Sequence, residues 1–163
     1  MPDNSPLKIF LATTEFTPLA KTGGLADVSA ALSMQFASKG LDIRVLMPFY
    51  STIDLAGLEV EIVPELQDLE IRLGERRINY WIVRASSDGP VPDVYLLQCP
   101  DLNGGTELYS GTHDHLMFIL LSRASIEMFQ RMEFKPDIFH CHDWNTALIP
   151  LYLKTIYGWD RMF

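Results

Sequence analysis

Short apolar runs and helical spacings alternate along the first fifty residues. Residues 8–12 form a short, almost wholly apolar run, which is typical of a strand covered on both faces. From residue 24 to residue 39 apolar side chains recur at steps of three and four, and Gly40 follows where a helix usually ends. Residues 42–47 form a second apolar run, closed by Pro48. This order predicts a parallel βαβ unit with a right-handed crossover. The apolar stripe that the helix is expected to bury consists of Leu25, Val28, Leu32 and Phe36.

The middle of the chain contains shorter runs of the β type. These runs cover residues 58–63, 69–73, 78–84 and 94–99. Glycine- or proline-containing segments separate them, and residues 74–77 predict a hairpin turn. Residues 101–111 hold three glycines and predict a long loop of the kind that often carries function. We therefore expect a part of the fold that is rich in β-hairpins.

Helical spacing returns in the last third of the chain. It covers residues 112–131, with Thr112 as the expected N-cap. Residues 137–142 predict a strand with a polar end, and residues 147–157 predict a helix with Pro150 in its first turn. The whole pattern predicts an α/β fold, with a Rossmann-like, mostly parallel sheet flanked by helices over residues 8–163. Residues 1–7 are expected to be a disordered tail.

Composition narrows the classes of partner. Of the 163 residues, 48% are apolar, which is enough for the core of one domain. The net charge is −8 and there is no arginine-rich run, so nucleic acid and anionic membranes are disfavoured. We find neither a signal peptide nor the roughly 20 apolar residues that a membrane span needs. Cys99 and Cys141 lie in predicted strands and outside any zinc spacing, so we expect reduced thiols in a cytosolic protein.

A glycine-containing turn lies where the first predicted strand gives way to the first helix. Ligands of open α/β sheets bind at this carboxyl edge. Gly23 and Gly24 would let a ligand approach main-chain N–H groups at a helix N-terminus, which favours phosphate, and Lys21 adds a positive charge. Asp27 adds a carboxylate that can bind hydroxyls. The alternative is a tight turn with a solvated Lys21 and an Asp27 that only complements the helix dipole. The turn is neither GxGxxG nor a P-loop, so it does not predict a dinucleotide site.

A second polar cluster follows the last predicted strand, at residues 140–145. Because parallel strands end at one edge of a sheet, both clusters are expected to face one crevice. We expect His140 and His142 to point to opposite faces of the strand, which argues against a shared metal ion. Asp143 can point into a cleft or cap the next helix, and Trp144 can belong to the core or support a ligand.

Taken together, these segments resemble the N-terminal domain of bacterial glycogen synthases and plant starch synthases. Residues 21–28 match the K-x-G-G-L-x-D-V signature of that family, and residues 44–48 match its second strand. Residues 136–144 are similar to its P-D-(I/V)-(V/I)-H-x-H-D-W motif. The similarity runs from Lys8 to the end of the chain.

The resemblance implies a retaining glycosyltransferase of the GT-B fold, in which two Rossmann-like domains face each other across a cleft. Such enzymes transfer glucose from a nucleotide sugar, ADP-glucose or UDP-glucose, to the nonreducing end of an α-1,4-glucan, without a metal ion or other cofactor. Residues 158–163 are typical of a connection to a further element. The resemblance implies that the C-terminal domain is missing from this chain and that the polypeptide alone is inactive.

The resemblance also implies roles for individual residues. Lys21, Gly23 and Gly24 would approach the donor diphosphate. Asp27 and Asp143 would be catalytic, lying beside the transferred glucose, with Asp143 stabilising an oxocarbenium-like centre rather than acting as a nucleophile. The residues expected to bind the acceptor or the sugar are Tyr109, His142 and Trp144.

Two segments depart from the family pattern. Residues 113–118 stand where many members have D-N-x-x-R-F, so that Met117 replaces the arginine, and Asn145 replaces a common histidine. The expected location is the bacterial cytoplasm or, for a plant protein, the plastid stroma. Two alternatives stay open: another two-domain nucleotide-sugar transferase of the sucrose or trehalose type, and a non-catalytic module that binds or scaffolds glucan.

Overall fold

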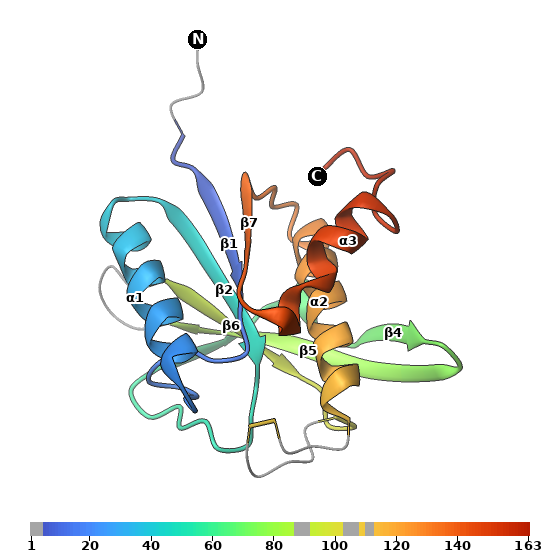
Figure 1. The fold of residues 1–163 in the computed structure, drawn as a ribbon, viewed down its shortest axis with the longest axis horizontal. Helices are drawn as coiled ribbons and strands as arrows, with labels where there is room; N and C mark the ends of the chain where they lie inside the picture. Colours follow the sequence, from blue (N-terminus) through green and yellow to red (C-terminus); the bar gives the residue numbers. More distant parts are fainter. Residues whose placement is uncertain (1–4, 87–91, 103–107, 110–112) are drawn as a thin grey trace.

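The computed structural model describes residues 5–86, 92–102, 108–109 and 113–163 (Figure 1). The strands are β1 (Lys8–Ala12), β2 (Asp42–Pro48), β3 (Glu59–Ile62), β4 (Leu69–Leu73), β5 (Arg76–Ser86), β6 (Asp93–Gln98) and β7 (Ile138–Cys141). The α-helices are α1 (Gly24–Ser38), α2 (Asp114–Arg131) and α3 (Leu148–Lys154), and the short 3-10 turns are η1 (Pro64–Leu66) and η2 (Trp144–Thr146). The apolar runs and helical spacings thus predicted these strands and α-helices, with bounds that shift by a few residues.

One sheet joins all seven strands. Its order is β3-β5-β6-β2-β1-β7, and β4 pairs with β5. The strands β6, β2, β1 and β7 are parallel neighbours, whereas β5 runs antiparallel to β3, β4 and β6. The prediction of a parallel βαβ unit is confirmed, because β1 and β2 are parallel neighbours with α1 between them in sequence. The prediction of a hairpin-rich middle is confirmed by β4 and β5, which are antiparallel and joined across Gly74 and Glu75 alone.

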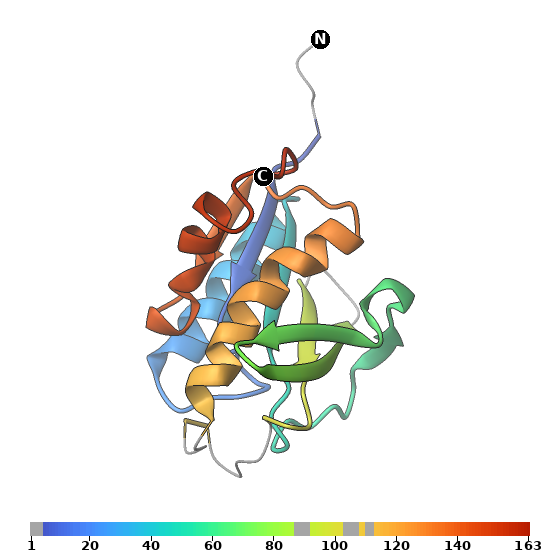
Figure 2. The same ribbon diagram turned by 90° about the vertical axis from the view of Figure 1, so that its right-hand side faces the viewer.

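Helices cover both faces of the parallel half of the sheet. Side chains of a strand point alternately to its two faces. Ile9 and Leu11 therefore pack in the cluster that contains Ala30 of α1, whereas Phe10 packs with Phe129 of α2. Helix α1 lies on one face, and α2 and α3 lie on the other (Figure 1). The β4–β5 hairpin lies beside α2 (Figure 2), where the hydroxyl of Tyr80 donates to Glu127 over 3.0 Å.

Helix α1 buries a different stripe from the one that its apolar spacing predicted. Its buried residues are Ala26, Ser29, Ala30 and Ser33. Val28 is 57% exposed, so its prediction as a core residue is wrong. Small side chains let the helix backbone approach the sheet closely, and the larger Leu25, Leu32 and Phe36 are then only partly buried at the sides of this contact. The helix ends as expected, with Gly40 at a φ of 76°.

The predicted ends of the last two helices are less accurate. Helix α2 begins at Asp114 with His113 in the N-cap position, and Thr112 lies outside the described residues. The helix predicted for residues 147–157 is shorter, because η2 precedes it and the chain turns back after Lys154. That turn needs a glycine at position 158, where a Cβ atom would lie 2.9 Å from the carbonyl oxygen of Lys154.

Both predicted irregular segments are described only in part. Of the predicted tail, residues 1–4 lie outside the described residues, and the carbonyl of Leu7 accepts a hydrogen bond from the N–H of Asp42. Of the predicted loop at residues 101–111, only residues 101–102 and 108–109 are described. No helix in the described part of the chain is long and apolar enough to cross a membrane.

Candidate active site

The two polar clusters meet at one edge of the sheet. Strands β1 and β7 are parallel neighbours with Ala12 paired to Cys141, and the N–H of His142 continues the ladder to the carbonyl of Ala12 over 3.0 Å. The chain after β1 therefore leaves the sheet next to the chain after β7. This confirms the prediction that both clusters lie at one carboxyl edge.

Lys21 and Asp27 form an ion pair at this edge. The Nζ atom of Lys21 lies 2.7 and 2.6 Å from the two carboxylate oxygens of Asp27. The hydroxyl of Thr17 donates to the same carboxylate over 2.9 Å. The hydrogen bonds from Lys21 and Thr17 lower the pKa of Asp27, so this group is a carboxylate at neutral pH. Both side chains are about half exposed, and exposed pairs of this kind contribute little to stability, so an anionic ligand can compete for Lys21.

Neither glycine of the turn is required by the fold of the described chain. Gly23 has an extended backbone with a φ of −149°, and Gly24 is not in the left-handed region either. A Cβ atom built on Gly23 or Gly24 would meet no protein atom within 4 Å. The tight-turn alternative therefore does not explain them. What a side chain would obstruct is access to the main chain at the first turn of α1, where N–H groups lack helical partners.

The buried carboxylate of Glu15 holds this turn in place through hydrogen bonds to its main chain. Glu15 is 3% exposed and accepts hydrogen bonds from the N–H of Thr22 (2.7 Å) and the N–H of Gly23 (3.1 Å). It also accepts from the hydroxyls of Thr22 (2.8 Å) and Tyr109 (2.8 Å). Burial raises the pKa of Glu15, but these hydrogen bonds outweigh it and lower the pKa overall. The N–H of Gly23 thus points at Glu15, and any phosphate contact falls to Gly24 and the residues after it.

Tyr109 lies against the turn although it is distant in sequence. Its hydroxyl also contacts the hydroxyl of Thr14 over 2.7 Å. Burial and the nearby Glu15 raise the pKa of Tyr109, so it stays protonated and can donate a hydrogen bond. Its backbone has a φ of 63°, which is rare for a residue other than glycine.

An aromatic row links Tyr109 with the second cluster. Phe118 of α2 lies between Tyr109, at 6.2 Å between ring centroids, and Trp144, at 5.1 Å with perpendicular planes. Trp144 is 67% exposed, so it does not belong to the core. An aromatic face held from behind and open to solvent can support the apolar face of a sugar ring.

Asp143 combines an exposed carboxylate with a strained backbone. Its φ of 64° and ψ of 179° fall in a region that is essentially reserved for glycine and that costs other residues about 1–3 kcal/mol. Its carboxylate accepts a hydrogen bond from the N–H of Trp144 over 2.6 Å and thereby caps η2. The capping alternative is thus real, but a cap alone does not require such a conformation, which is typical of functional sites.

His142 is buried and connected to α1. Its Nδ1 atom lies 2.9 Å from the hydroxyl oxygen of Ser29, and 8% of the residue is exposed. Burial, and next the neighbouring His140, lower its pKa, so the ring is neutral at neutral pH. The expectation that the two histidines point to opposite faces is wrong, because their ring centroids lie 4.6 Å apart. Side chains two positions apart in a strand lie on the same face. Among the described residues, no group of three or more His, Cys, Asp or Glu side chains could hold a metal ion.

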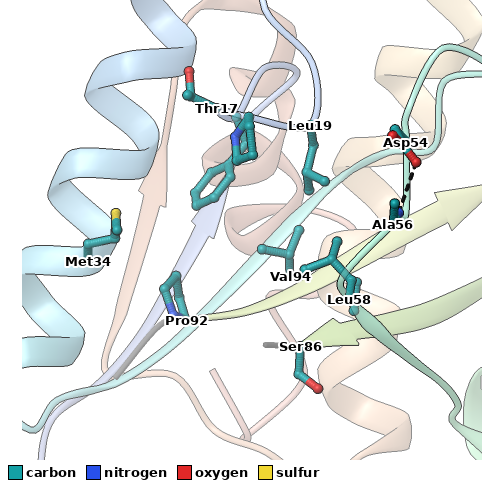
Figure 3. A pocket seen from close by; sticks show the side chains of 12 residues that line it. Thr17, Leu19, Met34, Asp54, Ala56, Leu58, Ser86, Pro92 and Val94 are labelled. Carbon is teal, nitrogen blue, oxygen red and sulfur yellow. Dashed lines mark hydrogen bonds between the residues drawn. The ribbon is translucent and has the colours of Figure 1, made fainter. Parts of the chain in front are cut away.

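A separate apolar cavity is lined in part by the β1–α1 loop. It has a volume of about 180 Å³ and lies between that loop, α1 and the segment before β3 (Figure 3). Leu19, Met34 and Leu58 line it together with nine other residues, which are mostly apolar. It contains none of the predicted site residues.

Comparison with known proteins assigns the chain to a family. Residues 8–163 match the family described as the starch synthase catalytic domain. The chain belongs to this family. Glycogen synthase 2 of Geobacter metallireducens is 39% identical over 162 residues, which are 96% of this chain and 33% of that protein. The glycogen synthase of Aeromonas hydrophila is 38% identical over 98% of this chain and 33% of its own length.

A solved structure shares the fold. The catalytic domain of Starch Synthase IV from Arabidopsis thaliana, bound to ADP and acarbose, has a TM-score of 0.84 and 25% identity. The similarity covers 94% of this chain and 31% of that one. The predicted family and the predicted Rossmann-like α/β fold are therefore confirmed, and this chain spans about a third of the length of the relatives it matches.

The two departures from the family pattern lie in buried positions. Met117, at the position of the motif's arginine, is 5% exposed and packs in the core between α2 and the sheet. Asn145 is 3% exposed, and its amide nitrogen has no hydrogen-bond partner within the described part of the chain. Methionine and asparagine are uncharged, so neither residue replaces the positive charge of the motif's arginine.

Sequence reasoning missed the residues that support the site. Glu15, Phe118, Ser29 and Thr13 were not among the predicted site residues. Ser29 directly follows the matched residues 21–28, and Phe118 ends the segment aligned with D-N-x-x-R-F, so position relative to a motif was the available signal for these two. Contacts such as that of Glu15 with Tyr109 join segments about a hundred residues apart, and no local pattern encodes that distance.

Proposed function

We propose that this chain is the N-terminal part of a retaining glucosyltransferase. The reaction is the transfer of glucose from ADP-glucose, or from UDP-glucose, to the nonreducing end of an α-1,4-glucan. The observation that carries the proposal is the open main chain at Gly23 and Gly24, next to Lys21 and on the same sheet edge as Asp143. The family assignment supports it, as does the likeness to a starch synthase structure bound to ADP and acarbose.

The turn after β1 would bind the donor diphosphate. The first-turn N–H groups of α1 and the positive end of its dipole suit a phosphate. Lys21 adds a full charge once the ligand displaces Asp27 from it. The leaving diphosphate gains negative charge in the transition state, so these groups stabilise the transition state more than the bound donor.

The two aspartates would act on the transferred glucose. The backbone of Asp143 holds its carboxylate at the exit of β7, where it can orient sugar hydroxyls and stabilise an oxocarbenium-like centre. Asp27, released from Lys21 by the donor, would bind sugar hydroxyls on the other side of the site. Neither role needs a covalent intermediate on the enzyme.

The aromatic row would bind the acceptor. Trp144 offers an exposed ring face, and Tyr109 offers a hydroxyl that Glu15 and Thr14 hold in place. The end of a glucan chain can stack on the ring of Trp144 and form a hydrogen bond with the hydroxyl of Tyr109. The remaining partner is a second Rossmann-like domain of the same protein, which would close over this edge and bind the nucleotide. A bacterial cytoplasm is the setting that we propose, in keeping with the named relatives.

The test uses the protein encoded by the complete reading frame. We expect that protein to transfer glucose from ADP-glucose to glycogen, and a parallel assay with UDP-glucose gives the preferred base. Asp143→Asn should lower kcat by at least 100-fold, because one preorganised electrostatic contact to a transition state is worth about that much. The matched control is Asp54→Asn, since Asp54 also caps a local N–H, that of Ala56 at 2.9 Å, but lies outside the site. Unchanged transfer by the Asp143→Asn protein would refute this site assignment.

A further inference from the structure

A chain of buried hydroxyls runs beneath the proposed sugar site. The hydroxyl of Thr13, just after β1, lies 3.1 Å from the hydroxyl of Ser29 on α1. The Ser29 hydroxyl lies 2.9 Å from Nδ1 of His142, just after β7. At its other end, the Thr13 hydroxyl lies 2.9 Å from the carbonyl oxygen of Glu15. Thr13 and Ser29 are 0% exposed, so bulk solvent does not reach their hydroxyls.

The direction of every hydrogen bond in the chain follows from counting protons. A hydroxyl has one proton to donate, and a carbonyl oxygen can only accept. Thr13 therefore donates to the carbonyl of Glu15. Ser29 then donates to Thr13, which leaves Ser29 no proton for the imidazole. The contact between Ser29 and His142 is a hydrogen bond only if Nδ1 of His142 carries a proton and donates it.

We propose that Thr13 and Ser29 are positioning residues that hold His142 as the neutral tautomer protonated on Nδ1, so that Nε2 is a hydrogen-bond acceptor for a hydroxyl of the bound sugar. The choice of ligand rests on the proposed function, whereas the tautomer does not. If Ser29 donated to His142 instead, the contact between Thr13 and Ser29 would contain no proton unless Thr13 turned away from the carbonyl of Glu15. Either case leaves a buried polar contact unsatisfied, and buried polar groups are rarely left unpaired.

The surroundings of Nε2 suit this role. No group in the described part of the chain hydrogen-bonds to Nε2. It is also not one of the unpaired polar atoms that are sealed from solvent there. His142 directly precedes Asp143, so these two residues occupy adjacent positions at the edge of the sheet. The ring is neutral because burial and His140 lower its pKa, which keeps the Nε2 lone pair free.

An acceptor at this point would discriminate between ligands. A sugar hydroxyl can donate to Nε2, whereas a deoxy or fluoro group at the same carbon cannot. A buried acceptor left unpaired costs binding energy, so such an analogue should bind at least about tenfold more weakly. The opposite tautomer would offer an N–H instead and would tolerate the fluoro group.

The first experiment measures the tautomer in this chain without any ligand. Ring nitrogen shifts of protein labelled with ¹⁵N-histidine, recorded at mildly alkaline pH and assigned with a His142→Gln sample, show which nitrogen carries the proton. We expect Nδ1 in the wild type and in Thr13→Ser, which keeps the hydroxyl. In Thr13→Val the proton of Ser29 is free to turn to Nδ1, so the ring proton should move to Nε2. Ser33→Ala is the matched control and should change nothing, because Ser33 is a buried serine one turn along α1 whose hydroxyl donates to the carbonyl of Ser29.

Each outcome decides part of the proposal. A wild-type ring protonated on Nε2, or a Thr13→Val ring that keeps its proton on Nδ1, overturns the hydroxyl chain and does not touch the proposed transfer reaction. The second experiment compares the KM for the sugar donor and for the glucan between Thr13→Val and Thr13→Ser proteins made from the complete reading frame. A rise of about tenfold in one KM for Thr13→Val alone supports the acceptor role. Unchanged kinetics despite a moved proton overturn it.

Discussion

At the level of single residues, Gly23 and Gly24 indicate that the turn after β1 binds a ligand. Gly57, with a φ of 82°, is needed by its own backbone, but Gly23 and Gly24 are not. Gly23→Ala and Gly24→Ala should therefore leave the free energy of unfolding within about 1 kcal/mol of the wild type. They should nevertheless weaken donor binding at least tenfold in the complete protein, because a methyl group would occupy space that the diphosphate needs.

Urea unfolding and donor KM measured on the same samples test this separation. Gly57→Ala is the opposite control, since a non-glycine residue in the left-handed region costs about 1–2 kcal/mol there without reaching the site. If Gly23→Ala or Gly24→Ala destabilised the protein as much as Gly57→Ala does, the glycines would be explained by folding.

Asp143 gives a second prediction at the residue level, in which stability and activity change in opposite directions. Glycine adopts a φ of 64° without strain, so Asp143→Gly should stabilise the chain by about 1 kcal/mol after the entropy of glycine in the unfolded state is subtracted. The same change removes the carboxylate and should abolish glucose transfer.

The matched control for Asp143→Gly is Glu133→Gly. Glu133 also has a positive φ, of 50°, in the turn after α2 and away from the site. Glu133→Gly should stabilise the chain by a similar amount, while glucose transfer stays at the wild-type level. Thermal unfolding and a glucose-transfer assay distinguish the two effects, and a destabilised Asp143→Gly chain would contradict the claim that this backbone is strained.

The site depends on the β1–α1 loop, which Glu15 holds in place. The ionisation of Glu15 makes the stability of the fold depend on pH. The pKa of Glu15 is lower in the folded chain than its ordinary value of 4.5. A carboxyl group with a depressed folded pKa stabilises the fold fully above its unfolded pKa, and this contribution is lost as the pH falls through 4.5 toward the folded pKa. We therefore expect the free energy of unfolding to fall with acid in that window.

Glu15→Gln should remove this acid sensitivity and lower the stability at neutral pH by about 1–3 kcal/mol, because an amide cannot accept all the N–H and O–H donors that meet there. Unfolding measured between neutral and acidic pH gives the slope. Glu65→Gln, an exposed substitution in η1, should reproduce the wild-type slope. An unchanged slope in the Glu15→Gln chain would show that the hydrogen bonds from Thr22, Gly23 and Tyr109 do not hold the loop.

Elements were predicted better than the contacts between them. The sequence pattern predicted β1 and β4 with their observed bounds. Burial on both faces leaves a continuous apolar run in β1, whereas burial on one face leaves an alternation of apolar and charged residues in β4. Helix α1 was placed correctly, but its buried face was not, since alanine and serine carry little hydrophobic signal and the exposed Val28 carries much. Asp143 was found through its motif, whereas the strain of its backbone depends on the junction of β7 and η2 and has no signature in sequence.

On the scale of the whole molecule, one carboxylate joins three parts of the chain that are distant in sequence. Glu127 of α2 accepts hydrogen bonds from Tyr80 of β5 (3.0 Å), from Tyr157 after α3 (2.7 Å) and from Arg123 (2.9 Å). Burial and Glu127 together raise the pKa of Tyr157 to about 12, so the phenol remains a donor. The hairpin, α2 and the C-terminal segment are thus tied at a point opposite to the helix that carries the glycine turn (Figure 1).

Glu127→Ala should therefore cost about 3 kcal/mol, because it leaves the partly buried guanidinium of Arg123 and two phenols without their acceptor. Glu61→Ala is the control, since Glu61 pairs with Arg84 on the surface and such pairs contribute about 1 kcal/mol or less. Urea unfolding followed by tryptophan fluorescence and by circular dichroism measures both changes. Since Trp81 lies in β5 and Trp159 follows α3, coincident transitions would show that the hairpin and the C-terminal segment unfold together. A Glu127→Ala chain as stable as Glu61→Ala would mean that apolar packing alone joins these parts.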